Sequence, residues 1–257
     1  MSGARELVLI AGWGMPGGVF AELAGLLAAR RRVTVRALPG FDGQAAVSPY
    51  DLPGLAAALW AGLETEAVDL AGWSLGGAAA AAMAAASPER VKSLCLIASN
   101  PKFVADNSWP GVAGEVLDAF ASSLRPGSDL QSGSEQLRPE QLLMRFAALL
   151  AQGDARGKPV LARLRAELRA APVPEARVLA AGLDLLRAAD WRRTLAAAAC
   201  PVSVLLGGRD ALTPPDLAGA LANVLPKARV YEFAEAGHAL FLSRPEEAAA
   251  AILEAAA

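Results

Sequence analysis

Short apolar segments alternate with segments of helical periodicity over residues 1–101. Continuous apolar runs are typical of strands buried on both faces of a parallel sheet, and four are found at residues 7–11, 33–38, 68–71 and 91–98. Between them, apolar residues recur at helical spacing over residues 19–29 and 52–63, and a run of alanine begins at Ala78. This alternating order predicts an α/β fold with a parallel, doubly wound sheet and right-handed connections.

The pattern changes between residues 102 and 189, where we expect no strand. Four helical stretches, separated by prolines, are predicted at residues 112–124, 141–150, 160–170 and 177–189. Residues 128–139, which are polar and contain glycine and serine, are expected to form a loop. Strands are expected again at residues 202–206 and 228–233, with helices at 215–224 and 245–256. We therefore expect residues 1–101 and 190–257 to form one core, with residues 102–189 inserted as a helical lid.

Composition and charge argue against several classes of function. The net charge is −2 and the basic residues are dispersed, so we expect no nucleic-acid partner. Cys95 and Cys200 lie far apart in apolar segments and His238 is the one histidine, which predicts free thiols and no metal site. Residues 1–6 lack the long apolar region of a secretory signal, and no apolar run is long enough to span a membrane. We expect a cytoplasmic monomer.

Ser74 is the candidate nucleophile. It is the central residue of Gly-Trp-Ser-Leu-Gly at positions 72–76, between a predicted strand and a predicted helix. In this context, G-x-S-x-G is typical of a nucleophile elbow, a sharp strand-to-helix turn that exposes a serine. Glycine is needed where such a turn brings two backbones too close for a Cβ, and the helix directs its first N–H groups at the serine. An ordinary turn with an incidental serine is the alternative.

A serine nucleophile needs a base, and the base needs a third group that orients it. His238 follows the last predicted strand, and Asp210 follows the strand before it. Ser74, Asp210 and His238 thus occur in the nucleophile–acid–base order of the α/β-hydrolases. Asp184 and Asp190 are rival acids, although both lie in or beside the helical segment. The alternatives are a turn-forming role for Asp210 and a non-catalytic role for His238.

The oxyanion of an acyl-transfer reaction needs two N–H donors. The N–H of Leu75, directly after the nucleophile, is the first candidate. The second is the N–H of Trp13, in the Gly-Trp-Gly loop at residues 12–14 after the first strand. A plain βα turn is the alternative explanation for that loop.

These motifs resemble the α/β-hydrolase superfamily over nearly the whole chain and, within it, the pimeloyl-[acyl-carrier protein] methyl ester esterases of biotin synthesis. The matching segments are residues 12–14, 38–41, 72–77, 87–91, 98–101, 109–111, 145–149 and 236–239. Ala11 stands where that family usually has histidine, so the oxyanion loop is expected to be braced differently. The chain also begins directly at the strand that is third in the usual fold, so we expect about six strands.

The resemblance implies a serine carboxylesterase that needs no cofactor and hydrolyses the methyl ester of a pimeloyl group still attached to its acyl-carrier protein. It implies that Ser74, Asp210 and His238 form the triad and that Trp13 and Leu75 form the oxyanion hole. Alternatives are a general esterase or another lid-bearing hydrolase acting on a free small-molecule ester, and a non-catalytic binding module. The implied acyl pocket comprises Trp13, Phe146, Ala147, Ala148, Leu149 and Leu150.

The same resemblance implies that basic residues of the lid dock the acidic carrier protein. The implied docking residues are Arg145, Arg156 and Lys158. For any one of these charges, a solvated helix face is the alternative.

Overall fold

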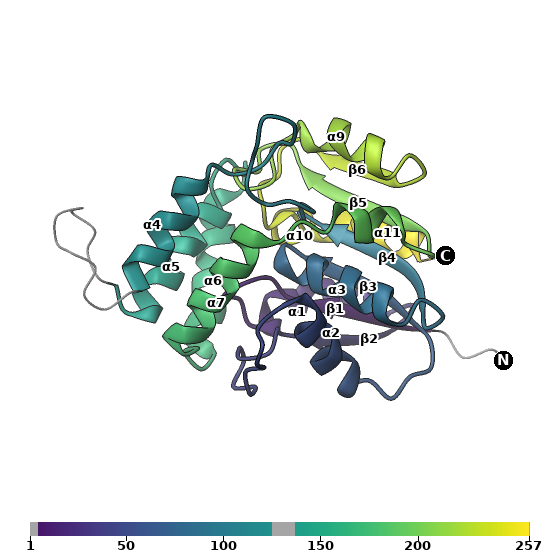
Figure 1. The fold of residues 1–257 in the computed structure, drawn as a ribbon, viewed down its shortest axis with the longest axis horizontal. Coiled ribbons are helices and arrows are strands. Elements are labelled where there is room, and N and C mark those ends of the chain that lie inside the picture. The colour runs from purple at the N-terminus through teal and green to yellow at the C-terminus, as the bar shows by residue number, and fades with distance from the viewer. Residues whose placement is uncertain (1–4, 125–136, 257) are drawn as a thin grey trace.

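The computed structural model describes residues 5–124 and 137–256. In this part of the chain, six parallel strands form one sheet in the order β2-β1-β3-β4-β5-β6 (Figure 1). The strands are β1 (Glu6–Ile10), β2 (Arg32–Arg36), β3 (Val68–Trp73), β4 (Val91–Ile97), β5 (Val202–Gly207) and β6 (Arg229–Phe233). The predicted parallel α/β sheet of about six strands is therefore confirmed.

Helices cover both faces of the sheet. On one face, α1 packs against α11, which also contacts β4 and β5; on the other, α3 lies against β1, β3 and β4 and beside α2 and α8. Besides a 3-10 turn, η1 (Gly17–Phe20), the core helices are α1 (Ala21–Ala28), α2 (Leu52–Ala61), α3 (Leu75–Ala86), α8 (Arg192–Ala196), α9 (Leu217–Val224), α10 (Leu240–Ser243) and α11 (Pro245–Ala255).

Four helices between β4 and β5 gather at one end of the sheet (Figure 1). They are α4 (Gly114–Leu124), α5 (Pro139–Leu150), α6 (Gly157–Ala170) and α7 (Ala176–Ala188), and we call them the helical insertion. Helix α6 reaches the core at η1 and α10. The chain leaves and re-enters the core side by side, since Lys102 and Asp190 form an antiparallel bridge. Most of the predicted polar loop, residues 128–136, lies outside the described residues.

Small side chains let α3 pack directly on the centre of the sheet. Ala79 and Ala80 are completely buried in this helix, and β1 and β3 are buried at every position. A Cβ on Gly76 would lie 2.4 Å from the carbonyl oxygen of Ile10, so a larger residue would push the helix away. This close approach places the N-terminus of α3, and with it Ser74, at the carboxyl ends of the strands.

No helix in the described part of the chain combines the length and the apolar character needed to cross a membrane.

Candidate active site

Ser74 occupies the strained turn between β3 and α3. Its φ of 54° and ψ of −123° are unfavourable for a residue with a side chain. The turn is tight enough that a Cβ on Gly72 would lie 2.3 Å from the carbonyl oxygen of Gly76. The structure therefore shows the predicted sharp strand-to-helix turn, and the flanking glycines are explained by backbone contact.

Hydrogen bonds on both sides hold this turn in place. The Ser74 N–H donates to the carbonyl of Ile97 at 2.9 Å. The Ser74 carbonyl accepts from the N–H of Gly77 at 2.9 Å and from Ser99 Oγ at 2.7 Å. Leu75 is the first residue of α3, where backbone N–H groups have no acceptor within their own helix. Such an N–H is available to a negative charge beside Ser74.

Asp210 and His238 form a buried pair. His238 Nδ1 lies 2.8 Å from Asp210 Oδ2, and the two side chains are 1% and 0% exposed. Asp210 Oδ1 accepts from the N–H groups of Leu212 and Thr213 at 2.7 and 3.0 Å, and Oδ2 also accepts from the Thr213 hydroxyl. A carboxylate held in this way fixes a histidine tautomer with the proton on Nδ1, which leaves Nε2 as a proton acceptor.

His238 lies beside the serine turn. The indole Nε1 of Trp73, the residue before Ser74, donates to the His238 carbonyl at 2.9 Å, and the two rings are 5.7 Å apart. His238 Nε2 is buried and makes no hydrogen bond within the described residues. Of the rival acids, Asp190 is exposed and pairs with Arg192, and Asp184 is exposed. Asp210 is the predicted acid that contacts the imidazole.

The loop after β1 forms the other side of the site. A Cβ on Gly12 would lie 3.2 Å from Ser74 Cβ, so this loop runs directly past the serine. Trp13 is buried, and its Nε1 donates to the carbonyl of Leu179 in α7 at 3.1 Å. Its ring meets Phe146 of α5 edge to face at 4.7 Å. The helical insertion thus braces the loop that follows Ala11.

The predicted acyl-pocket residues do not share one environment. Phe146, Ala147 and Leu150 are buried, whereas Leu149 is half-buried and Ala148 is exposed. A cavity of about 210 Å3 lies between the insertion and the core, and none of these predicted pocket residues lines it. Its walls are partly apolar, with Gly14, Phe41, Leu143, Met144, Leu168 and Pro172, and partly charged, with Asp42, Glu140 and Arg169.

The three predicted docking residues are all exposed on the helical insertion. Arg145 lies on α5, Lys158 on α6 and Arg156 just before α6. Arg156 Nη1 also donates to the carbonyl of Ser243 in α10 at 3.1 Å. This arginine therefore connects the insertion to the core.

Residues 7–251 match the model of the alpha/beta hydrolase family. The chain belongs to that family. It is 38% identical to the pimeloyl-[acyl-carrier protein] methyl ester esterase of Chromobacterium violaceum, and the match covers 97% of this chain and 93% of the relative. Identity is also 38% to the protein of the same name in Aromatoleum aromaticum, over 96% of both chains.

Solved structures share the fold of this alpha/beta hydrolase. A bromoperoxidase from Bacillus anthracis superposes with a TM-score of 0.82 at 19% identity, over 98% of this chain and 92% of the other. An esterase from Exiguobacterium antarcticum gives 0.79 at 19% identity, over 99% and 92%.

Two residues that form hydrogen bonds at the site, Thr213 and Asp154, were not predicted from the sequence. Thr213 donates hydrogen bonds to the carboxylate of Asp210 from its N–H and its hydroxyl. Because Thr213 follows Asp210 by only three residues, the local sequence could have indicated this contact. Asp154 lies between α5 and α6. It accepts a hydrogen bond at 2.8 Å from the N–H of Gly237, the residue directly before His238. No local pattern indicates that contact, because it joins the insertion to a loop 83 residues away.

No group of three or more His, Cys, Asp or Glu suited to a metal ion occurs in residues 5–124 and 137–256.

Proposed function

We propose that this chain is a serine carboxylesterase that hydrolyses the methyl ester of pimeloyl-acyl-carrier protein in biotin synthesis. The observation that carries the chemistry is the buried Asp210–His238 pair beside the strained turn at Ser74. The substrate is proposed from the relatives, which are named after this activity and are similar to this chain over nearly their whole length.

Each residue of the site has a role in the proposed reaction. Ser74 Oγ attacks the ester carbonyl, and His238 Nε2 takes the hydroxyl proton while Asp210 holds the imidazole. The N–H groups of Trp13 and Leu75 stabilise the negative charge on the carbonyl oxygen. His238 then returns the proton to the leaving methoxide, and methanol departs. Water, activated by His238, hydrolyses the acyl-enzyme and frees Ser74.

We further propose that residues 102–189 act as a lid and that the acyl chain lies against Trp13 and residues 146–150. The contact between Trp13 and Phe146 supports this, because it brings the lid to the oxyanion loop. Arg145, Arg156 and Lys158 would attract an acidic carrier protein. A general esterase for free esters is the second candidate. The cytoplasmic location and the monomeric state stay predictions.

Labelling with a fluorophosphonate tests the nucleophile. The wild-type protein should gain the mass of one label on Ser74, and Ser74→Ala should gain none and lose esterase activity. The exposed Ser108→Ala is the matched control and should label like the wild type. Absence of labelling in folded wild-type protein contradicts the enzyme proposal.

Charge reversal tests the carrier. Arg145→Glu should lower kcat/KM for the carrier-bound methyl ester about tenfold, or about 1.4 kcal/mol, and leave hydrolysis of the free pimelate methyl ester unchanged. Arg30→Glu makes the same charge change at an exposed position next to the end of α1, outside the insertion, and should affect neither. Equal hydrolysis of both esters, unaffected by Arg145→Glu, favours the general esterase.

A further inference from the structure

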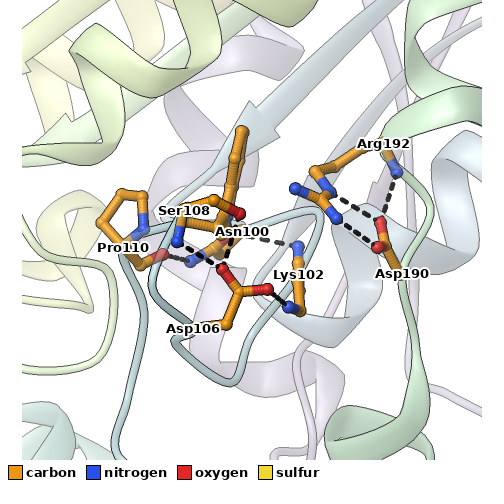
Figure 2. A network of polar contacts seen from close by, with 8 residues as sticks. Asn100, Lys102, Asp106, Ser108, Pro110, Asp190 and Arg192 are labelled. Atoms are coloured by element: carbon orange, nitrogen blue, oxygen red, sulfur yellow. Dashed lines mark hydrogen bonds and ion pairs between the residues drawn. The ribbon is translucent and has the colours of Figure 1, made fainter.

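The helical insertion is joined to the core at both of its ends. Asn100 is buried in the loop after β4, and its Oδ1 accepts from the Lys102 N–H at 3.1 Å. At the other end, Arg192 donates to Asp190 from two guanidinium nitrogens, at 2.6 and 2.9 Å. Figure 2 shows both groups of residues, and a bridge between Lys102 and Asp190 connects them. These local contacts hold the ends of the insertion without using its middle.

A third attachment lies in the middle of the insertion, in the loop of residues 151–156 between α5 and α6. The Ala155 N–H donates to the Glu235 carbonyl at 2.9 Å, and Asp154 Oδ2 accepts from the Gly237 N–H at 2.8 Å. A Cβ on Gly237 would lie 3.2 Å from the Cβ of Asp154, so the loop packs directly on this backbone. The middle of the insertion is therefore hydrogen-bonded to the segment that leads into the histidine of the site.

The same loop also contacts the segment that leads into Asp210. Gly153 has a φ of 81°, and a Cβ at this position would lie 2.3 Å from the Arg209 carbonyl oxygen. Both the positive φ and the close approach require glycine here. The Arg209 N–H donates in turn to the Ala236 carbonyl at 2.9 Å. The loop of residues 151–156 thus lies against both of the core segments that carry the acid and the base.

Hydrogen bonds hold the backbone of His238 on both sides. Trp73 Nε1 donates to the His238 carbonyl at 2.9 Å, and Asp154 accepts from the N–H of the preceding residue. The first contact ties the histidine to the serine turn, and the second ties it to the insertion. Because the imidazole moves with this backbone, loss of either contact would let Nε2 leave the position in which it can accept a proton. A displacement of about 1 Å is enough to slow a reaction substantially.

We propose that Asp154 is a positioning residue for His238 and that, through it, the helical insertion contributes to the chemical step. The inference rests on the proposed function, in which His238 Nε2 takes the proton of Ser74. Asp154 acts through the Gly237 N–H and not on the ester, so its contribution should be the same for a free ester and for one attached to a carrier protein. An insertion that served only to bind the substrate would instead affect KM.

Asp154 also stabilises its own loop, and the two roles can be separated. Its Oδ1 accepts from the Arg156 N–H at 2.7 Å in an Asx turn, whereas Oδ2 binds Gly237. In Asp154→Ser, the hydroxyl can replace the contact within the loop, because serine forms the same kind of turn, but it is too short to reach Gly237 as well. Asp154→Asn keeps an oxygen on a side chain of the original length and can still accept from Gly237.

Steady-state kinetics of these variants test the proposal. We expect Asp154→Ser and Asp154→Ala to lower kcat about tenfold with unchanged KM, equally for the free pimelate methyl ester and the carrier-bound ester. The loss should appear whichever step limits kcat, since His238 transfers a proton in both acylation and deacylation. Asp154→Asn should restore most of the activity. Asp184→Ala removes an exposed carboxylate from α7 of the same insertion and should behave like the wild type.

The rate of fluorophosphonate labelling measures the activation of Ser74 without an ester or a carrier protein. It should fall about tenfold in Asp154→Ser and recover in Asp154→Asn, because labelling needs the same proton transfer to His238. The proposal is overturned if these two variants have equal kcat and equal labelling rates, or if only KM changes. This comparison remains decisive if Asp154→Ala does not fold. If Ser74→Ala is as active as the wild type, the proposed function itself fails.

Discussion

Replacing Gly182 by alanine should impair catalysis more than it impairs folding. Gly182 lies in α7, and a Cβ at this position would lie 2.4 Å from Cδ1 and 2.6 Å from Nε1 of Trp13. The indole cannot move freely, since it is buried, packed edge to face on Phe146 and hydrogen-bonded to the Leu179 carbonyl. The added methyl group would therefore displace the indole of Trp13 and, with it, the backbone N–H of Trp13, which is the proposed oxyanion donor.

The magnitude follows from three opposing contributions to the free energy of unfolding. Alanine in place of glycine stabilises a helix by about 1 kcal/mol. Overpacking a core costs about 1–3 kcal/mol, and loss of the hydrogen bond from Trp13 costs about 1 kcal/mol. The variant should be about 1–3 kcal/mol less stable than the wild type. Loss of an oxyanion donor costs about 3 kcal/mol in the transition state, which lowers kcat on the order of a hundredfold.

Denaturant unfolding and kcat for a methyl ester measure the two effects. Gly25→Ala in α1 and Gly219→Ala in α9 are the controls, because nothing lies within 4 Å of a Cβ at either position. Both should be up to about 1 kcal/mol more stable than the wild type and fully active. The reasoning is refuted if Gly182→Ala gains stability like the controls and keeps the wild-type kcat.

Three further predictions concern the site and the core. Asp210→Asn should fold and lower kcat on the order of 10⁴-fold, because an amide favours the wrong imidazole tautomer; a wild-type kcat would exclude Asp210 as the orienting acid. Asp154→Ala should lower kcat roughly tenfold, the value of about one hydrogen bond, whereas Asp154→Asn retains an acceptor for Gly237 and should be near the wild type; equal kcat in both variants contradicts a positioning role. Burial raises the pKa of Cys95 to about 12, so this thiol should resist iodoacetamide in the native protein. The unfolded chain releases this proton near pH 8.5, so the free energy of unfolding should decline above that pH by up to about 1.4 kcal/mol per pH unit; a Cys95→Ala variant that declines equally would rule out this thiol as the cause.

Local pattern was sufficient to predict the six strands and the longer helices, although not the short helices α8 and α10, and to propose the three polar groups of the site. The turn at Ser74 is a strand, two glycines and a helix in immediate succession, and each part is visible within a few residues. Asp210 and His238 could be placed with it because each follows a strand, and the carboxyl ends of parallel strands meet at one edge of the sheet. The structure shows that the last two are in contact.

Tertiary structure decided what surrounds those groups. The contacts of Asp154 with Gly237 and of Trp13 with Gly182 join segments far apart in the chain, and neither leaves a periodic signal. A small cavity beside Ser74 is likewise a property of packing, since side chains from α3, the loop after β4 and the end of α7 line it together. Periodicity indicates which face of an element is buried, but the volume left between three elements depends on their relative positions. The sequence alone therefore determined the fold and the residues proposed for the chemistry, and the packed structure decided which distant residues surround and brace them.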